Sequence, residues 1–87
     1  MARKIFIGDK VETAWGVGIV HDARSWREAI VGMDDYEAVE FSDKCKVEVG
    51  IDYKDVWVEL LVVVRGMKRR VLGTQVVVLE GRDDATT

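Results

Sequence analysis

Apolar and polar residues alternate with a period of two along much of this chain, which is typical of β-strands with one buried face. The segment 45–51 alternates strictly, so we expect a half-buried strand there. The segment 56–64 predicts the longest strand, and one of its faces is entirely apolar. The letters GMKR then predict a hairpin turn into a further strand over 71–80. Shorter strands are expected within 3–13, 14–21 and 36–41.

A single helical signal interrupts this pattern near 25–33. Ser25 and Glu28 have the spacing of a capping box, in which the serine caps the first turn and the glutamate reaches back to it. Apolar residues then recur at i, i+3, i+4 and i+7, the spacing of one helix face. That face would hold Trp26, Ala29, Ile30 and Met33. The sequence therefore predicts one short helix near 25–33.

Length and composition place these elements in one small domain. The chain has 87 residues, enough for a single core, and 16 of them are valines, which favour strands. Five or six short strands at regular spacing predict a small barrel or a curled sheet. We assign residues 1–80 to this all-β to β-rich α+β domain and 81–87 to a polar C-terminal tail.

The stretch GDKVETAWGVGIV resembles the opening hairpin of SH3-like small barrels, such as KOW and Tudor-type modules and the polymerase-interacting domain of CarD-type transcription regulators. The resemblance covers about residues 5–64. It implies an SH3-like small barrel of five to six antiparallel strands. Aromatic residues from loops often line the ligand groove of such barrels, so the resemblance makes Trp15 and Tyr53 candidate groove residues. From its position beside a turn, Trp15 suits binding and packing equally.

The residues needed for common catalytic and metal sites are scarce. His21 is the only histidine and Cys45 the only cysteine, so no nucleophile–base pair or zinc-ligand spacing stands out. The letters GVG lack the third glycine of the dinucleotide fingerprint. We therefore expect no catalytic residue, no metal and no cofactor. The single cysteine indicates a cytoplasmic protein, and the longest apolar run, 60–64, is far shorter than the roughly 20 residues that span a membrane.

Charge is distributed unevenly around a net value of −3. Residues 34–59 hold nine acids and three bases, whereas 65–70 hold four bases and no acid. These bases are Arg65, Lys68, Arg69 and Arg70. They could contact phosphates, or they could keep a hairpin tip soluble and discourage edge pairing. The acidic net charge, and the lack of aromatic residues between these bases, disfavour nucleic acid.

The two C-terminal strands are apolar on both faces, so a single subunit would leave one face uncovered. We therefore predict a homodimer or higher oligomer. The predicted interface contains Leu61, Val63, Val76 and Val78. The leading functional hypothesis is a non-enzymatic, self-associating module that binds a protein or peptide. The alternative is a nucleic-acid or transcription-complex accessory protein that uses 65–70, and a third is a small oligomeric enzyme with a site at its interface.

Overall fold

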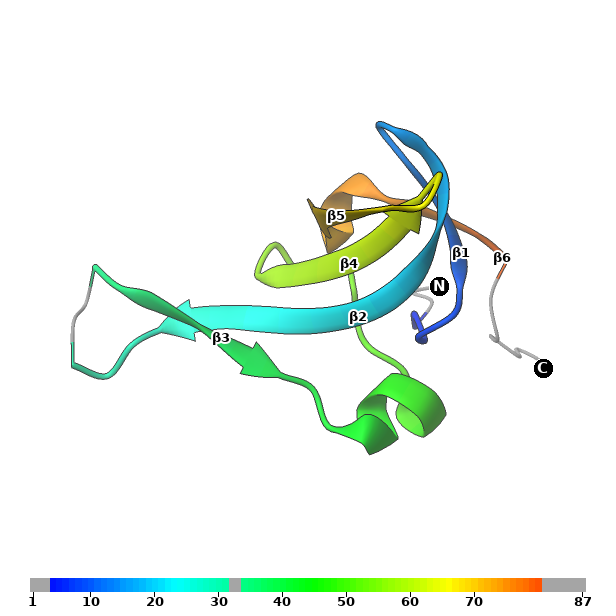
Figure 1. Ribbon diagram of the computed structural model, residues 1–87. Helices are drawn as coiled ribbons and strands as arrows, with labels where there is room; N and C mark the ends of the chain where they lie inside the picture. The colour runs from blue at the N-terminus through cyan, green and yellow to red at the C-terminus, as the bar shows by residue number, and fades with distance from the viewer. Residues whose placement is uncertain (1–3, 32–33, 81–87) are drawn as a thin grey trace.

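The computed structural model describes residues 4–31 and 34–80, which form one curled antiparallel sheet of six strands (Figure 1). The strands are β1 (Lys10–Thr13), β2 (Gly16–Glu28), β3 (Tyr36–Glu40), β4 (Val58–Val64), β5 (Met67–Leu72) and β6 (Val77–Glu80). Two short turns of helix are η1 (Cys45–Val49), a π turn, and η2 (Gly73–Gln75), a 3-10 turn. The β-rich fold class is confirmed. The expected tail, 81–87, lies outside the described residues.

Strand β2 organises the sheet because it is long enough to pair with three neighbours. Its first half pairs with β1 and β4, and its second half pairs with β3 and β4. The sheet order is β5-β4-β2-β1-β6, so the edge strands β5 and β6 are consecutive in the chain and are joined by η2. This arrangement curls the sheet around one core, and it is compatible with the expected small barrel.

The core lies on the inner face of the sheet and is built mainly from aliphatic side chains. Alternation along β4 buries Val58, Leu60, Val62 and Val64, as the pattern predicts, whereas Val56 lies before the strand and is 58% exposed. Burying one such side chain contributes about 1.5–3 kcal/mol. The other core residues are Ile5, Val11, Val20, Ala23, Ile51, Tyr53, Val71 and Val76. We call the opposite side of β2, β4 and β5 the outer face; on β4 it runs from Trp57 to Val63.

Two glycine positions set the curvature and the hairpin turn. A Cβ on Gly18 would lie 2.5 Å from the carbonyl oxygen of Val63, so only glycine lets β2 pass this close to β4. The turn between β4 and β5 consists of Arg65 and Gly66, with φ values of 52° and 79°. Two successive positive φ values are typical of a tight two-residue hairpin. The turn therefore lies one residue earlier than the expected GMKR segment and shares only Gly66 with it. Lys68, Arg69 and Arg70 lie on β5.

The helix expected near 25–33 is wrong. Residues 25–28 extend β2, and they pair with β3 in a register that places Glu28 opposite Tyr36. Residues 32 and 33 lie outside the described part. The apolar spacing has no core to pack against, because Ile30 and Val31 are 92% and 99% exposed. A short helix depends on such packing, whereas the extended chain gains hydrogen bonds from its neighbours.

The strand expected over 45–51 is also wrong. The N–H of Lys46 donates to the carbonyl oxygen of Ser42 at 3.0 Å, and the N–H of Gly50 donates to that of Cys45 at 2.8 Å, which closes the π turn. Ile51 alone pairs in extended form, as an isolated bridge to Ile5. The segment instead satisfies its backbone groups with these turn hydrogen bonds, and the Lys46 side chain holds it against β2 and β3.

The strand expected over 71–80 is divided by η2. Gly73 packs so closely on the backbone of Tyr53 that any side chain would clash with the Tyr53 carbonyl group. The chain turns at this contact, and Val76 then enters the core at 1% exposure. The expected strand therefore becomes the end of β5 and all of β6.

Candidate functional site

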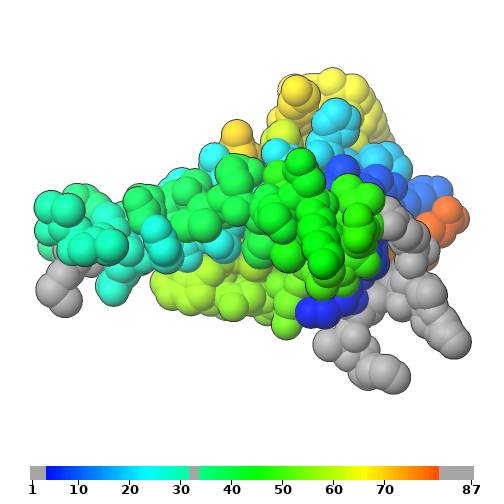
Figure 2. Space-filling model, turned by 90° about the horizontal axis from the view of Figure 1, so that it is seen from below, coloured from blue at the N-terminus to red at the C-terminus, as the bar shows by residue number. Residues whose placement is uncertain are grey.

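Strand β2 continues past the start of β4 and, together with β3, forms a hairpin that projects from the body of the molecule (Figures 1 and 2). We call residues 26–37 the arm; residues 32 and 33 lie outside the described part. An ion pair between Arg27 Nη2 and Glu37 Oε2, 2.8 Å apart, joins its two strands. Near its tip, Ile30 and Val31 are almost fully exposed. The arm thus offers an apolar tip on a strand pair fixed by hydrogen bonds.

An open groove of about 450 Å³ lies where the arm meets β4. Its lining residues are Trp26, Arg27, Glu28, Tyr36 and Trp57. The rings of Tyr36 and Trp57 stack with their centroids 5.9 Å apart and their planes 19° from parallel. Both residues remain about half exposed, at 49% and 50%. We call this the aromatic groove. Exposed aromatic side chains of this kind supply large, rigid contact area for a partner.

The turn before β4 holds Trp57 in the groove. The carboxylate of Asp55 accepts a hydrogen bond from the N–H of Trp57 at 2.8 Å, and the Asp55 carbonyl oxygen accepts one from Val58 at 3.0 Å. The carbonyl oxygen of Trp57 accepts the N–H of Trp26 at 2.8 Å. Because Val58 points into the core, strand alternation places Trp57 on the outer face.

The groove lies in the most acidic part of the chain. The arm holds one base and four acids, a net charge of −3, which equals the net charge of the whole chain. The base, Arg27, is already paired with Glu37. Glu28 is exposed on the rim, and no described residue forms an ion pair with it. The Arg24 guanidinium lies 4.8 Å from the centre of the Trp26 ring, so a cation already contacts one aromatic wall. The groove therefore suits a ligand that combines apolar surface with positive charge.

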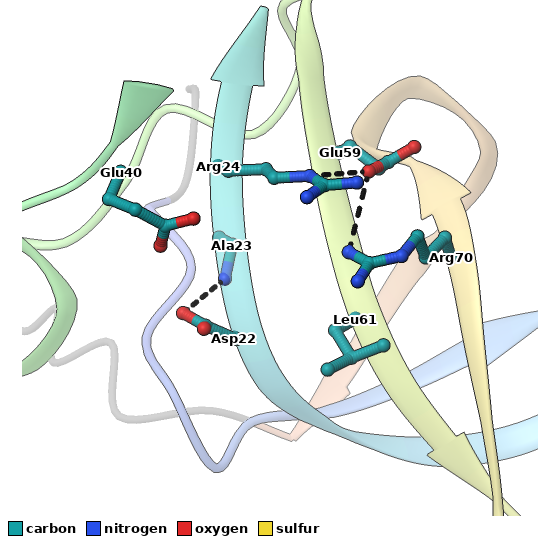
Figure 3. A pocket seen from close by; sticks show the side chains of 7 residues that line it. All are labelled: Asp22, Ala23, Arg24, Glu40, Glu59, Leu61 and Arg70. Atoms are coloured by element: carbon teal, nitrogen blue, oxygen red, sulfur yellow. Dashed lines mark hydrogen bonds and ion pairs between the residues drawn. The ribbon is translucent and has the colours of Figure 1, made fainter. Parts of the chain in front are cut away.

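Beside the groove, the outer face carries a set of ion pairs (Figure 3). One carboxylate oxygen of Glu59 accepts a hydrogen bond from Arg24 Nε at 2.8 Å and lies 3.6 Å from Arg70 Nη1. The Glu59 side chain is only 19% exposed, so solvent screens these pairs incompletely. The hollow that they border is small, with a volume of about 80 Å³. Its charged lining residues already pair with one another or with Lys46.

Lys46 ties η1 to the base of the arm. Its Nζ lies 2.7 Å from Asp22 Oδ1 on β2 and 3.3 Å from Glu40 Oε1 on β3. The hydrogen bond from Lys46 lowers the pKa of Asp22 below its ordinary value of 3.8. The same hydrogen bond raises the pKa of Lys46 above 10.5. Both groups are therefore charged at neutral pH, and their pairing fixes η1 against the sheet.

The basic cluster of 65–70 does not form one patch. Alternation along β5 places Arg69 on the inner side, where its guanidinium lies 4.8 Å from the centre of the Trp15 ring. Lys68 and Arg70 point to the outer face, and Arg70 contacts Glu59. Arg65 lies in the turn itself. The four charges therefore point in different directions.

The two candidate groove residues implied by the resemblance, Trp15 and Tyr53, lie in different parts of the fold and differ in burial. Trp15 lies in the turn between β1 and β2, is 47% exposed and is covered on one side by Arg69. Tyr53 is 6% exposed within the core, against Gly73. Neither residue lines the aromatic groove or the hollow beside it.

The four residues expected at a subunit interface also differ in their burial and position. Leu61 and Val63 lie half-buried on the outer face of β4, where a second subunit could reach them. Val78 packs against the core from β6, and Val76 is part of the core itself. The position of Val76 therefore excludes it from any interface of the folded subunit.

The sequence did not single out the groove, because its walls come from three separate segments. The sequence predicts Trp26 on a helix face, whereas the structure places it on β2; it also leaves half of Trp57 exposed. One signal was present. Trp57 shares its alternation with Glu59, on the side of β4 opposite the buried valines.

Comparisons of the chain with protein-family models, curated proteins and solved structures found no match. No function is therefore carried over from a relative. Within 4–31 and 34–80, no group of three or more His, Cys, Asp or Glu residues is placed to hold a metal ion. The described helical turns also include none long and apolar enough to cross a membrane.

Proposed function

We propose that this chain is a non-enzymatic protein-interaction module whose aromatic groove binds an apolar, positively charged segment of a partner. The observation that carries this proposal is the stacked pair of Tyr36 and Trp57, half exposed beside Trp26 in an acidic arm. Neighbouring exposed apolar side chains that form one patch, unlike single ones, typically mark an interaction site.

The dimensions and the charge of the groove support one kind of ligand. A volume of about 450 Å³ lies within the range of about 300–1,000 Å³ that is usual for ligand pockets. The rings offer apolar walls and faces that attract cations, while the carboxylate of Glu28 offers a pairing site at the rim. A partner segment with an aliphatic or aromatic residue next to Lys or Arg satisfies all of these groups.

Selection from a random peptide library on the immobilised protein tests the proposal. We expect enriched peptides to share an aliphatic or aromatic residue next to Lys or Arg. Trp57→Ala should weaken their binding by at least about 2 kcal/mol, the effect of removing an interface hot spot. Trp15→Ala removes a similar ring outside the groove and should bind as the wild type does. Peptides that share no pattern, or that bind the Trp57→Ala protein as tightly as the wild type, would contradict the proposal.

The nucleic-acid alternative is supported by one observation. Arg69 and Trp15 form a basic and aromatic pair that the sequence did not reveal, and such pairs can stack bases. Against it, Arg70 contacts Glu59, and the four bases of 65–70 are divided between two faces. We rank this alternative second. The third hypothesis, an enzyme with a site at a subunit interface, stays a prediction from the sequence.

The cytoplasm remains the compartment that we propose. The only cysteine, Cys45, is free and half-buried in η1, so it serves no disulfide within the chain. A reducing compartment suits a lone thiol of this kind.

A further inference from the structure

A second copy of this chain presents apolar side chains next to lysines, the combination that suits the aromatic groove. Across the outer face, the strand registers align Lys10 on β1, Ile19 on β2, Val63 on β4 and Lys68 on β5. We call this the basic row: two aliphatic side chains flanked by two lysines. Ile19 is 42% exposed and Lys68 is exposed, so the row is accessible in the single chain.

The groove and the basic row lie at opposite ends of the same face. Val63 on β4 lies six positions after Trp57, which immediately precedes the strand, and six positions span about 20 Å at the usual rise of a strand. Between these ends, Glu59 is neutralised by Arg24 and Arg70 within the same chain. Among the described residues, Glu28 at the groove end and Lys68 at the other end form no ion pair, so a negative and a positive charge remain at opposite ends of the face. Lys10 of the basic row lies 4.0 Å from Glu80 within the same chain, and the exposed Glu12 follows it on β1.

We infer that two copies pack their outer faces together in antiparallel fashion, with the aromatic groove of each over the basic row of the other. A two-fold axis at the level of Leu60, midway between Trp57 and Val63 and running across the strands, produces this arrangement. It places Trp57 opposite Val63 of the second copy, since both lie three positions from Leu60 along the chain. It also brings Glu28 and the acidic arm toward the lysines of the second copy. Each contact occurs twice, as a symmetric dimer requires.

This inference rests on the proposed function, because the contact surface is the same groove and the second copy is its ligand. It also accounts for the apolar outer positions Leu61 and Val63, which a solitary subunit leaves half-exposed. A partner protein with a similar basic, apolar segment would compete with the second copy for the groove.

Sedimentation equilibrium of charge-reversal variants tests the inference. We expect the wild type to dimerise, and Glu28→Lys and Lys68→Glu each to weaken the dimer about tenfold or more, because both symmetric contacts turn from attraction to repulsion. The variant with both changes restores opposite charges at both contacts, so it should dimerise nearly as the wild type does. An equal mixture of the two single variants should form mixed dimers for the same reason.

The matched controls are Asp43→Lys and Lys44→Glu, which make the same charge changes at exposed positions just before η1. They should dimerise as the wild type does. Raising the salt from about 0.1 M to 1 M should weaken the wild-type dimer, since the screening length falls from about 10 Å to 3 Å. If both control variants dimerise as the wild type does, an effect of net charge alone on dimerisation is excluded.

Three results would overturn the inference. The wild type could remain monomeric at all concentrations, the single variants could dimerise as tightly as the controls do, or the double variant could fail to recover. A monomeric wild type that still selects basic, apolar peptides through its groove would leave the proposed function in place. A restored charge-swapped dimer without any peptide selection would support the dimer and count against an external ligand.

Discussion

Replacing Lys46 with Met removes one charge that joins η1 to the sheet and keeps most of the apolar stem. In the wild type the Lys46 ammonium group lies 2.7 Å from Asp22 Oδ1 and 3.3 Å from Glu40 Oε1. Its side chain is only 16% exposed, so water screens the pairing less than at an open surface. Lys46→Met should therefore destabilise the fold without disturbing the core.

The magnitude follows from the two contacts. A surface ion pair contributes about 0.2–1 kcal/mol, and the shielded position of Lys46 puts the closer pair near the upper end. The second contact is longer, and Glu40 is 59% exposed, so it adds little. We expect the free energy of unfolding to fall by about 1 kcal/mol at pH 7, which lowers Tm by about 4–8 °C in a domain of this size.

The stabilisation that the Lys46–Asp22 pair contributes depends on pH, and the two pKa shifts define where it is lost. Lys46 holds the pKa of Asp22 below 3.8 in the folded state, so the stabilisation is present above that value and is lost as the pH falls through the folded pKa. The pKa of Lys46 is raised above 10.5, so the stabilisation is present below that value and is lost as the pH rises through the folded pKa. The difference between wild type and variant should be full at pH 7 and should vanish at both extremes.

Urea unfolding followed by tryptophan fluorescence, from pH 7 down to about pH 3, measures this difference. Lys44→Met is the control, because Lys44 is an exposed neighbour and no described residue forms an ion pair with it. Asp22→Asn combined with Lys46→Met should destabilise by less than the sum of the single changes. A difference that stays constant with pH, or that the control reproduces, would refute the reasoning.

Three further predictions concern the fold and the surface. Gly18→Ala should cost more than about 2 kcal/mol in urea unfolding, because the new Cβ would lie 2.5 Å from the Val63 carbonyl oxygen; wild-type stability would contradict this. Val76→Lys should abolish the folded circular dichroism spectrum, because it buries a charge at a position 1% exposed, and a folded variant would contradict the core assignment. Labelled DNA and RNA should show no micromolar binding by fluorescence anisotropy at about 50 mM salt. Tight binding that is lost when the three bases of β5 become Ala would favour the nucleic-acid alternative.

The sequence predicts those parts of the fold that local alternation alone determines. The buried face of β4 follows directly from the valines and leucine of 58–64, because one side of a half-buried strand must be apolar. The segment 25–33 shows the limit of this reasoning. Its apolar spacing fits a helix, but the state adopted depends on whether a core lies beside it, and Ile30 and Val31 meet none.

The candidate site could not be predicted from the sequence, because its residues come together only through the register of strand pairing and not through any local sequence pattern. Tyr36 and Trp57 meet only because β3 and β4 flank the same stretch of β2. In the same way, the tight turn at Arg65 fixes the phase of β5, which sends Arg69 inward to Trp15 and divides the basic cluster. Pairings between residues so far apart in the chain leave no local signal in the sequence.

The central claim is that the aromatic groove is the contact surface, and the three tryptophans allow a direct measurement. Each gives one indole N–H signal in a ¹H–¹⁵N spectrum; Trp26 and Trp57 line the groove, whereas Trp15 lies outside it against Arg69. We predict that titration with a basic, apolar peptide from the library selection shifts the Trp26 and Trp57 signals and leaves that of Trp15 in place. A shift confined to Trp15, or no shift at saturating peptide, would contradict the account.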